Sequence, residues 1–210
     1  MSEQGQGWAN PAPAGLTALA VACFTFYALL TGKVDATALP LLGAWLLGGF
    51  VVQLIVGLIE YKEGGLIGAN VFTVFAAFFM FTGGIEMFVK FSNAMNKVTL
   101  DARIDGWAWL VLAITLVIWT FGYLKTAPLC LNLAVICLDV ACILIAFHDL
   151  GVTGPSSAII AGNFLLLTGI MGLYTAGAII LNTSFGRTIL PMGGPVIKEP
   201  KTTSLNIYKN

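Results

Sequence analysis

Six long apolar stretches constrain the fold of this chain more than any other feature of its sequence. They cover residues 14–31, 38–59, 66–88, 107–124, 129–147 and 157–181. A helix needs about 20 apolar residues to cross a hydrocarbon core of about 30 Å. The stretches therefore predict six transmembrane helices. The connections between them are short, apart from the third, and leave no room for a separate soluble domain.

We therefore expect an all-α membrane protein with one compact bundle. The membrane domain is predicted to cover residues 10–192. A disordered polar tail is expected over residues 1–9 and a C-terminal tail over residues 193–210.

The composition supports this class and excludes several others. Charged residues make up 10% of the chain, whereas soluble domains carry about 25%. A net charge of zero does not favour a nucleic-acid partner. Cys23, Cys130, Cys137 and Cys142 lie inside apolar stretches and read as small buried residues. Because the chain also has a single histidine, we expect no zinc or other metal site and no disulfide framework.

No sequence pattern suggests catalysis. The chain has no HExxH motif, no phosphate-binding glycine loop and no plausible nucleophile–base pair. We therefore expect a conduit for small solutes and neither an enzyme nor a cofactor-binding protein.

The charge distribution predicts the orientation of the chain. An even number of spans places both termini on one side of the membrane. That side would hold six of the ten basic residues: Lys62, Lys125, Arg187, Lys198, Lys201 and Lys209. The positive-inside rule then places both termini in the cytoplasm. We expect the protein to cross the cytoplasmic membrane.

A few polar residues interrupt the spans. Asn70 and Asn132 either join neighbouring helices or contribute to a polar pathway. Asp139 is expected to be protonated, paired or hydrated, because a charge in mid-span costs about 3 kcal/mol or more. It either handles protons or makes a local hydrogen bond. His148 follows the fifth span, where a solvated loop residue is favoured over a pH sensor.

Small residues recur along the last span. Gly162, Gly169, Gly172 and Ala176 share one helical face. Such a face lets another helix approach closely, so helix packing is favoured over a pore lined by bare backbone.

The stretch NPAPAGL, residues 10–16, leads into the first span. Pro11 and Pro13 suit the first turn of a helix, and Asn10 is a good N-cap. One interpretation is simply a well-started helix. The alternative is an anion site, in which the unpaired amides of Ala12, Ala14 and Gly15 meet a carboxylate at the positive end of the helix dipole.

This stretch also resembles the NPAP[LAV]GL signature of the acetate uptake transporter family, the succinate–acetate permeases. Two further motifs follow in the same order. GLIEYKEGGLIGANVFTVFAAFF, at residues 57–79, is similar to the family's second-to-third helix junction. FGRTILPMG, at residues 185–193, is similar to its C-terminal FGRTVLP.

The resemblance implies a urea-channel-like bundle of six helices with a pore in each protomer, assembled as a homohexamer. It also implies uptake of acetate, succinate and related carboxylates, commonly described as proton-linked. Channel and symporter both remain open. The resemblance assigns the substrate site to Asn10, Pro11 and Pro13, to which the helix-start argument adds Ala14 and Gly15.

The family's pore narrows at an apolar constriction, which the resemblance assigns to Leu19, Phe75 and Leu138. Members often have Phe and Tyr at the first two of these positions. The resemblance also marks Glu60 at the helix junction, and we group it with Asn70, Asn132 and Asp139 as candidates for a proton or polar role.

The sequence thus predicts a membrane permease or channel for acetate and related carboxylates. A channel for small neutral solutes, such as urea or short amides, is the alternative on the same scaffold. A sensor or scaffold that transports nothing is a third class.

Overall fold

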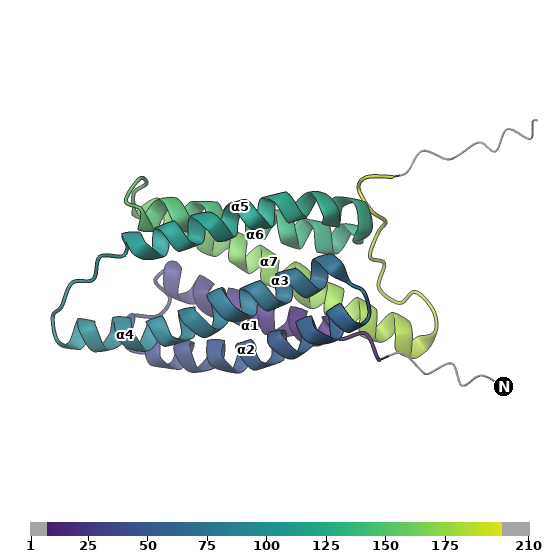
Figure 1. The fold of residues 1–210 in the computed structure, drawn as a ribbon, viewed down its shortest axis with the longest axis horizontal. Helices are drawn as coiled ribbons and strands as arrows, with labels where there is room; N and C mark the ends of the chain where they lie inside the picture. Colours follow the sequence, from purple (N-terminus) through teal and green to yellow (C-terminus); the bar gives the residue numbers. More distant parts are fainter. Residues whose placement is uncertain (1–7, 199–210) are drawn as a thin grey trace, which may run out of the picture.

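The structure is a computed structural model that describes residues 8–198 and has six helical spans across them (Figure 1). α1 covers Ala12–Leu30, and a short turn, η1 (Ala36–Ala38), leads into α2 (Leu39–Lys62). The third span is built from α3 (Leu66–Phe75), η2 (Ala76–Thr82) and α4 (Gly83–Met95). α5 (Arg103–Thr126), α6 (Leu129–Asp149) and α7 (Pro155–Phe185) complete the bundle.

The prediction of an all-α protein with six membrane-length helices is confirmed. Several helices run beyond the apolar stretches: the third span continues to Met95, and α5 begins at Arg103. Residues 1–7 and 199–210, most of the two predicted tails, lie outside the described residues.

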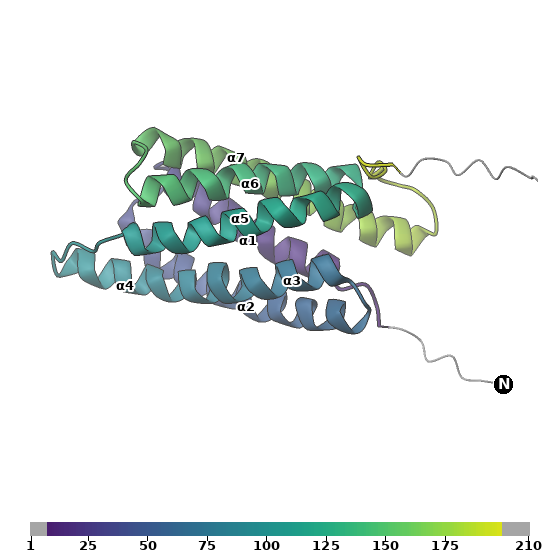
Figure 2. The same cartoon turned by 45° about the horizontal axis from the view of Figure 1, so that its top comes forward.

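The spans follow one another around a ring. α1 packs against α2 and α7, α6 lies between α5 and α7, and α2 packs along the third span. The third span and α5 make the sparsest contact between neighbours in this ring. Figures 1 and 2 show α5 beside α6, and α2 beside the third span, with both ends of the described chain at the same end of the bundle.

The third span changes its winding in the middle. Residues of η2 adopt a π-helix, and the Thr82 hydroxyl donates to the carbonyl of Ala77, five residues earlier. π-segments inside α-helices occur frequently at functional sites. Here the segment directs Phe79 into the core, where its ring stacks on Phe26 and meets the edge of Trp109, with centroids 5.3 and 5.5 Å apart.

Glycines bring the helices into close contact. A Cβ atom on Gly43 of α2 would lie 2.7 Å from the carbonyl oxygen of Gly84 in α4. In α7, a Cβ atom on Gly169 would lie 2.8 Å from the Phe24 ring of α1. The small-residue face of the last span therefore packs against α1, which confirms the packing interpretation.

The crossing of α2 and α4 generates a first prediction. In Gly43→Ala the added methyl group would force the two helices apart, because it would collide with backbone. We expect the free energy of unfolding to fall by about 1–3 kcal/mol, measured as a lower thermal unfolding midpoint in detergent. Gly48→Ala, on the same helix, should not lower it, because no atom of the described residues outside the local helix backbone lies within 4 Å of the new methyl group. Equal midpoints would contradict the prediction.

Candidate functional site

A cavity of about 350 Å³ lies inside the ring and is lined by residues from all six spans. Its apolar wall includes Phe26, Phe75, Phe79, Trp109 and Leu138. Charged and titratable side chains line it at the end of the bundle opposite the termini: Glu86, Lys90, Asp105, His148 and Asp149. The cavity therefore combines an apolar body with a charged mouth.

The three residues expected to form a constriction belong to one apolar cluster. Phe75 and Leu138 are buried there and line the cavity. Leu19 is partly buried and packs against the same cluster, without lining the cavity. The tertiary structure thus brings the three together, and their role as a sieve stays a prediction.

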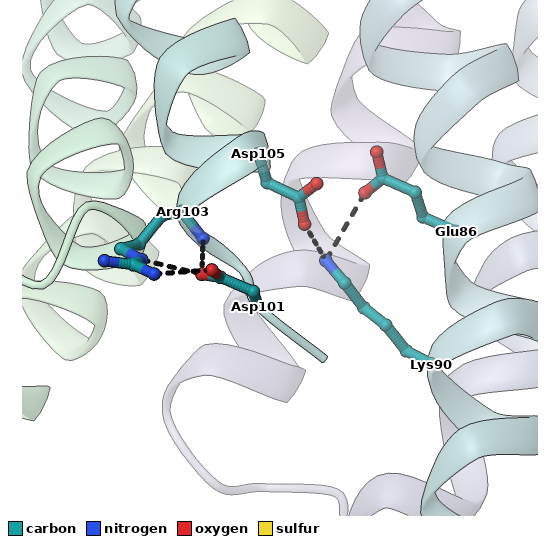
Figure 3. A network of polar contacts seen from close by, with 5 residues as sticks. All are labelled: Glu86, Lys90, Asp101, Arg103 and Asp105. Atoms are coloured by element: carbon teal, nitrogen blue, oxygen red, sulfur yellow. Dashed lines mark hydrogen bonds and ion pairs between the residues drawn. The ribbon is translucent and has the colours of Figure 1, made fainter. Parts of the chain in front are cut away.

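The charged mouth is organised around Lys90 (Figure 3). Its Nζ atom lies 2.8 Å from Asp105 Oδ2 on α5 and 3.3 Å from Glu86 Oε2 on α4. A second pair, Arg103 with Asp101, stands beside it with an N–O distance of 2.6 Å. The hydrogen bonds from Arg103 lower the pKa of Asp101 to about 2. Sequence reasoning missed the Lys90 cluster, because its members come from three separate helices.

At the opposite end, the start of α1 differs from expectation. The helix begins at Ala12, and Pro11 occupies the N-cap position, so the expectation that Asn10 is the N-cap is wrong. Asn10 lies one residue earlier, and its Oδ1 atom accepts a hydrogen bond of 2.9 Å from the Ala12 amide. The Ala14 amide donates to the Pro11 carbonyl over 3.1 Å. The expectation that these two amides are unpaired is therefore wrong, since the chain itself satisfies both. The other polar group of the Asn10 side chain is its NH₂, which is a donor.

Further along the same turn, α1 faces the bundle interior. Pro13 and Gly15 are buried, while Ala14 is exposed. The ring of Phe72 occupies the space beside Gly15, where a Cβ atom would lie 2.5 Å from it. The start of α1 thus contacts the third span, and part of it faces the bundle interior.

Gln53 of α2 is a polar residue at this site that the sequence-based set omitted. It is 1% exposed, and its Nε2 atom donates to the carbonyl of Gly15 over 3.4 Å. Its Oε1 atom is buried with no hydrogen-bond partner among the described residues. A lone amide inside an apolar helix was the available signal.

Glu60 and Asn70 lie at the junction of α2 and α3. The Glu60 carboxylate sits against Gly65 and Gly68, leaving no space there for a Cβ atom on Gly65. Asn70 accepts from the Tyr61 hydroxyl over 3.0 Å and donates to the Leu66 carbonyl over 2.8 Å. Asn70 therefore joins α2 to α3, as one of its two interpretations requires.

Asn132 and His148 each have a local partner. The Asn132 side chain donates to the Ala127 carbonyl over 2.9 Å, and its Oδ1 atom is buried with no partner among the described residues. His148 Nδ1 lies 3.5 Å from the Ser157 hydroxyl at the start of α7. His148 also lines the cavity, so it is more than a solvated loop residue.

Asp139 is paired within the membrane-spanning part of the bundle. The Thr120 hydroxyl lies 2.8 Å from Asp139 Oδ2 and 2.9 Å from the Leu116 carbonyl oxygen. A hydroxyl has a single hydrogen, so it cannot satisfy two acceptors fully. A protonated Asp139 would donate to Thr120, which would then donate to Leu116, and both contacts would be satisfied. The geometry therefore suits a neutral carboxyl group.

Hydrogen bonds hold the C-terminal motif against the helices at the terminal end of the bundle. Asn182 Oδ1 accepts from the amides of Ile189 and Leu190, and the Tyr174 hydroxyl donates to the Pro191 carbonyl over 2.7 Å. The Ile197 amide donates to the Leu124 carbonyl over 2.8 Å. The first residues of the predicted C-terminal tail therefore lie against α5.

Comparison with known proteins gives consistent matches over nearly the whole chain. The sequence profile of the GPR1/FUN34/yaaH family matches residues 2–192. Proteins named "Succinate-acetate/proton symporter SatP" from Escherichia coli K12 and Shigella flexneri are 32% identical over 191 residues, or 88% of this chain and 95% of theirs. A solved structure titled "Structure of the bacterial acetate channel SatP" superimposes with a TM-score of 0.76 at 25% identity. It covers 89% of this chain and 99% of its own.

The Asp139–Thr120 pair generates a second prediction. Asp139→Asn should keep the thermal unfolding midpoint close to that of the unmodified protein, because an amide can donate to Thr120 as a protonated carboxyl does. Thr120→Val should cost about 1–3 kcal/mol by leaving a buried carboxyl without a partner. Thermal unfolding in detergent measures both. An Asn variant that unfolds well before the Val variant would indicate an ionised carboxylate instead.

Proposed function

The chain belongs to the GPR1/FUN34/yaaH family, and we propose that it is a membrane permease or channel for acetate and related small carboxylates, including succinate, with proton-linked uptake. The observation that carries the proposal is the family match combined with a cavity lined by residues from all six spans. The named relatives, a succinate–acetate/proton symporter and an acetate channel, support the same substrate class.

The physical obstacle to such transport is dehydration of the substrate. An isolated carboxylate costs many kcal/mol to bury without partners, whereas the free acid costs much less. A small carboxylic acid has a pKa near about 4.3, by analogy with glutamate, so the free acid is scarce at neutral pH. A conduit helps if it supplies hydrogen-bond donors at its mouths and a short apolar passage between them.

Different residues are proposed to bind the carboxylate and to form the apolar passage. Asn10, with the start of α1 at Pro11, Pro13, Ala14 and Gly15, is proposed to receive the carboxylate at the terminal end. Gln53, which touches Gly15, adds a buried amide to this region.

Leu19, Phe75 and Leu138 are proposed to form the sieve, since they share one apolar cluster. Asp139, one residue after Leu138, is proposed to carry a proton, because its contacts suit the neutral form. Glu60, Asn70 and Asn132 are proposed to shape the polar surroundings of the terminal end.

Orientation and assembly follow as part of the proposal. Both termini are placed in the cytoplasm and the protein in the cytoplasmic membrane, on the basic-residue distribution described above. A homohexamer is proposed from the family resemblance. The outer faces of the bundle expose many large apolar side chains, which suit contact with lipid or with neighbouring protomers.

A third prediction concerns the docking role of Asn10. Asn10→Ala should reduce labelled acetate uptake into proteoliposomes, because it removes both the acceptor for the Ala12 amide and the amide donor. Asn10→Ser keeps an acceptor for the Ala12 amide but lacks the amide NH₂ group, so it isolates the docking role. We expect both variants to lose uptake by about tenfold.

Recovery of uptake in the Ser variant would limit the role of Asn10 to accepting the hydrogen bond from the Ala12 amide. Unlabelled succinate should compete with acetate in the unmodified protein, whereas urea and acetamide should not. Competition by the amides alone would favour the neutral-solute alternative. An absence of any flux would favour the scaffold class.

A fourth prediction concerns the sieve. Phe75→Ala should raise the uptake of butyrate or benzoate relative to acetate by about tenfold, because a wider passage admits bulkier acids. Phe81→Ala is the matched control. It also removes a phenyl ring, but Phe81 lies in η2, is 43% exposed and is outside the cavity wall. Equal selectivity of the two variants would remove Phe75 from the sieve.

A further inference from the structure

The charged mouth of the cavity contains one lysine among three carboxylates. Glu86 and Lys90 come from α4, Asp105 from α5, and His148 and Asp149 from α6. The Asp105 side chain is 15% exposed and that of Lys90 34% exposed, so both are largely withdrawn from solvent. With His148 neutral, the formal charge of this group is −2, which is unusual for the mouth of a pathway that carries anions.

The simplest account of the cluster is structural. The Lys90–Asp105 pair fastens α4 to α5 at 2.8 Å, where the third span and α5 otherwise make sparse contact. This account explains why one pair exists. It does not explain why the pair faces a cavity of about 350 Å³, or why two more carboxylates surround it.

The chemistry of an ammonium group suggests a second use for Lys90. It has three N–H donors, and two carboxylates are within 3.3 Å of its Nζ atom. A substrate carboxylate that reaches the mouth is chemically equivalent to Glu86 and Asp105. It can replace either of them at Lys90 with little change in the number of hydrogen bonds.

We propose that Lys90 is a carboxylate-binding site at the mouth of the cavity, where the substrate displaces Asp105 or Glu86 and the displaced side chain takes up a proton. The inference rests on the proposed transport function and deepens it by locating where substrate and proton bind together. It involves no covalent step: one anion and one proton enter, and the charge of the site is unchanged.

Charge conservation is the physical reason for the coupling. An added anion alone would take the site from −2 to −3, and like charges held within a few ångströms repel one another. A proton taken up at the same time keeps it at −2. The three carboxylates of the cluster are the groups that can accept such a proton.

The charge balance also includes the side chains that the neighbouring helices bring to the mouth. Glu86 lies on its own helix, Asp105 on α5, and His148 and Asp149 on α6, with the Ser157 hydroxyl of α7 beside His148. Linkage requires that a proton tightens carboxylate binding by the same factor by which the carboxylate tightens proton binding. Breaking the Lys90–Asp105 pair would also loosen α4 from α5, which widens the mouth as the substrate arrives.

The experiment uses the full chain in proteoliposomes with two readouts. Counterflow of labelled acetate reports binding and exchange at each pH. An internal pH dye reports the protons that accompany net uptake. Unmodified protein is compared with Lys90→Gln, Lys90→Arg, Glu86→Gln and Asp105→Asn. Arg103→Gln is the control, because it removes a cation from the same end of the bundle outside the cavity wall.

We expect Lys90→Gln to raise the half-saturating acetate concentration by about tenfold or more and Lys90→Arg to restore most of the loss. Asp105→Asn should bind acetate more tightly at neutral pH and flatten the pH dependence of counterflow, because Lys90 then loses its main competitor. Glu86→Gln should act in the same direction with a smaller effect, since its contact is longer. Arg103→Gln should match the unmodified protein in both readouts.

The possible failures are distinguishable. If unmodified protein exchanges acetate and Lys90→Gln is indistinguishable from it, the inference falls and the transport function stands. If the unmodified protein exchanges no acetate, both fall. If Lys90→Gln does not fold, as judged by gel filtration in detergent, the pH profile of Asp105→Asn decides: an unchanged profile overturns the proton coupling.

Discussion

Close contact between helices at glycine residues is the constraint on which the rest of this bundle depends. Lipid tails are as apolar as leucine, so helices in a membrane gain little from hiding apolar surface against one another, and packing decides which of them associate. Gly43 against Gly84 sets the distance between α2 and α4, and Gly169 sets that between α7 and α1. Between the third span and α5 such contacts are sparse, and the Lys90–Asp105 pair joins the two helices there. The cavity lies inside the resulting ring.

The two ends of the bundle differ in their chemistry. Neutral amides lie at the terminal end, where Asn10 Oδ1 accepts from the Ala12 amide and the Gln53 side chain contacts Gly15. At the opposite end, a lysine and three carboxylates line the cavity around Lys90. The apolar cluster that contains Phe75 and Leu138 lies among all six spans. A carboxylate crossing such a structure would exchange water for donors at each end, and the stretch between them favours a small, neutral solute.

Sequence reasoning succeeded where the signal lies along a single helix. It identified the six spans and the packing face of the last span, since both follow from composition and from helical periodicity. It was wrong about the amides of Ala12 and Ala14, because it did not foresee that Asn10 and Pro11 accept their hydrogens. It placed Asp139 correctly among paired, hydrated or protonated groups, but its partner, Thr120, lies nineteen residues away on another helix. It passed over Gln53 of α2, because the contact of its side chain with Gly15 of α1 is not visible in the sequence.

The sequence by itself determined the class of protein: a chain with 58% hydrophobic residues and six long apolar stretches must fold in a membrane as helices, since each helix satisfies its own backbone there. Its motifs also indicated the family. Tertiary structure alone decided which side chains share a cavity. Helical periodicity reports which face a residue occupies on its own helix, yet it carries no information on the order of helices around a ring. The contacts that three successive helices make at Lys90 therefore depend on packing, and they became visible only once the ring was assembled.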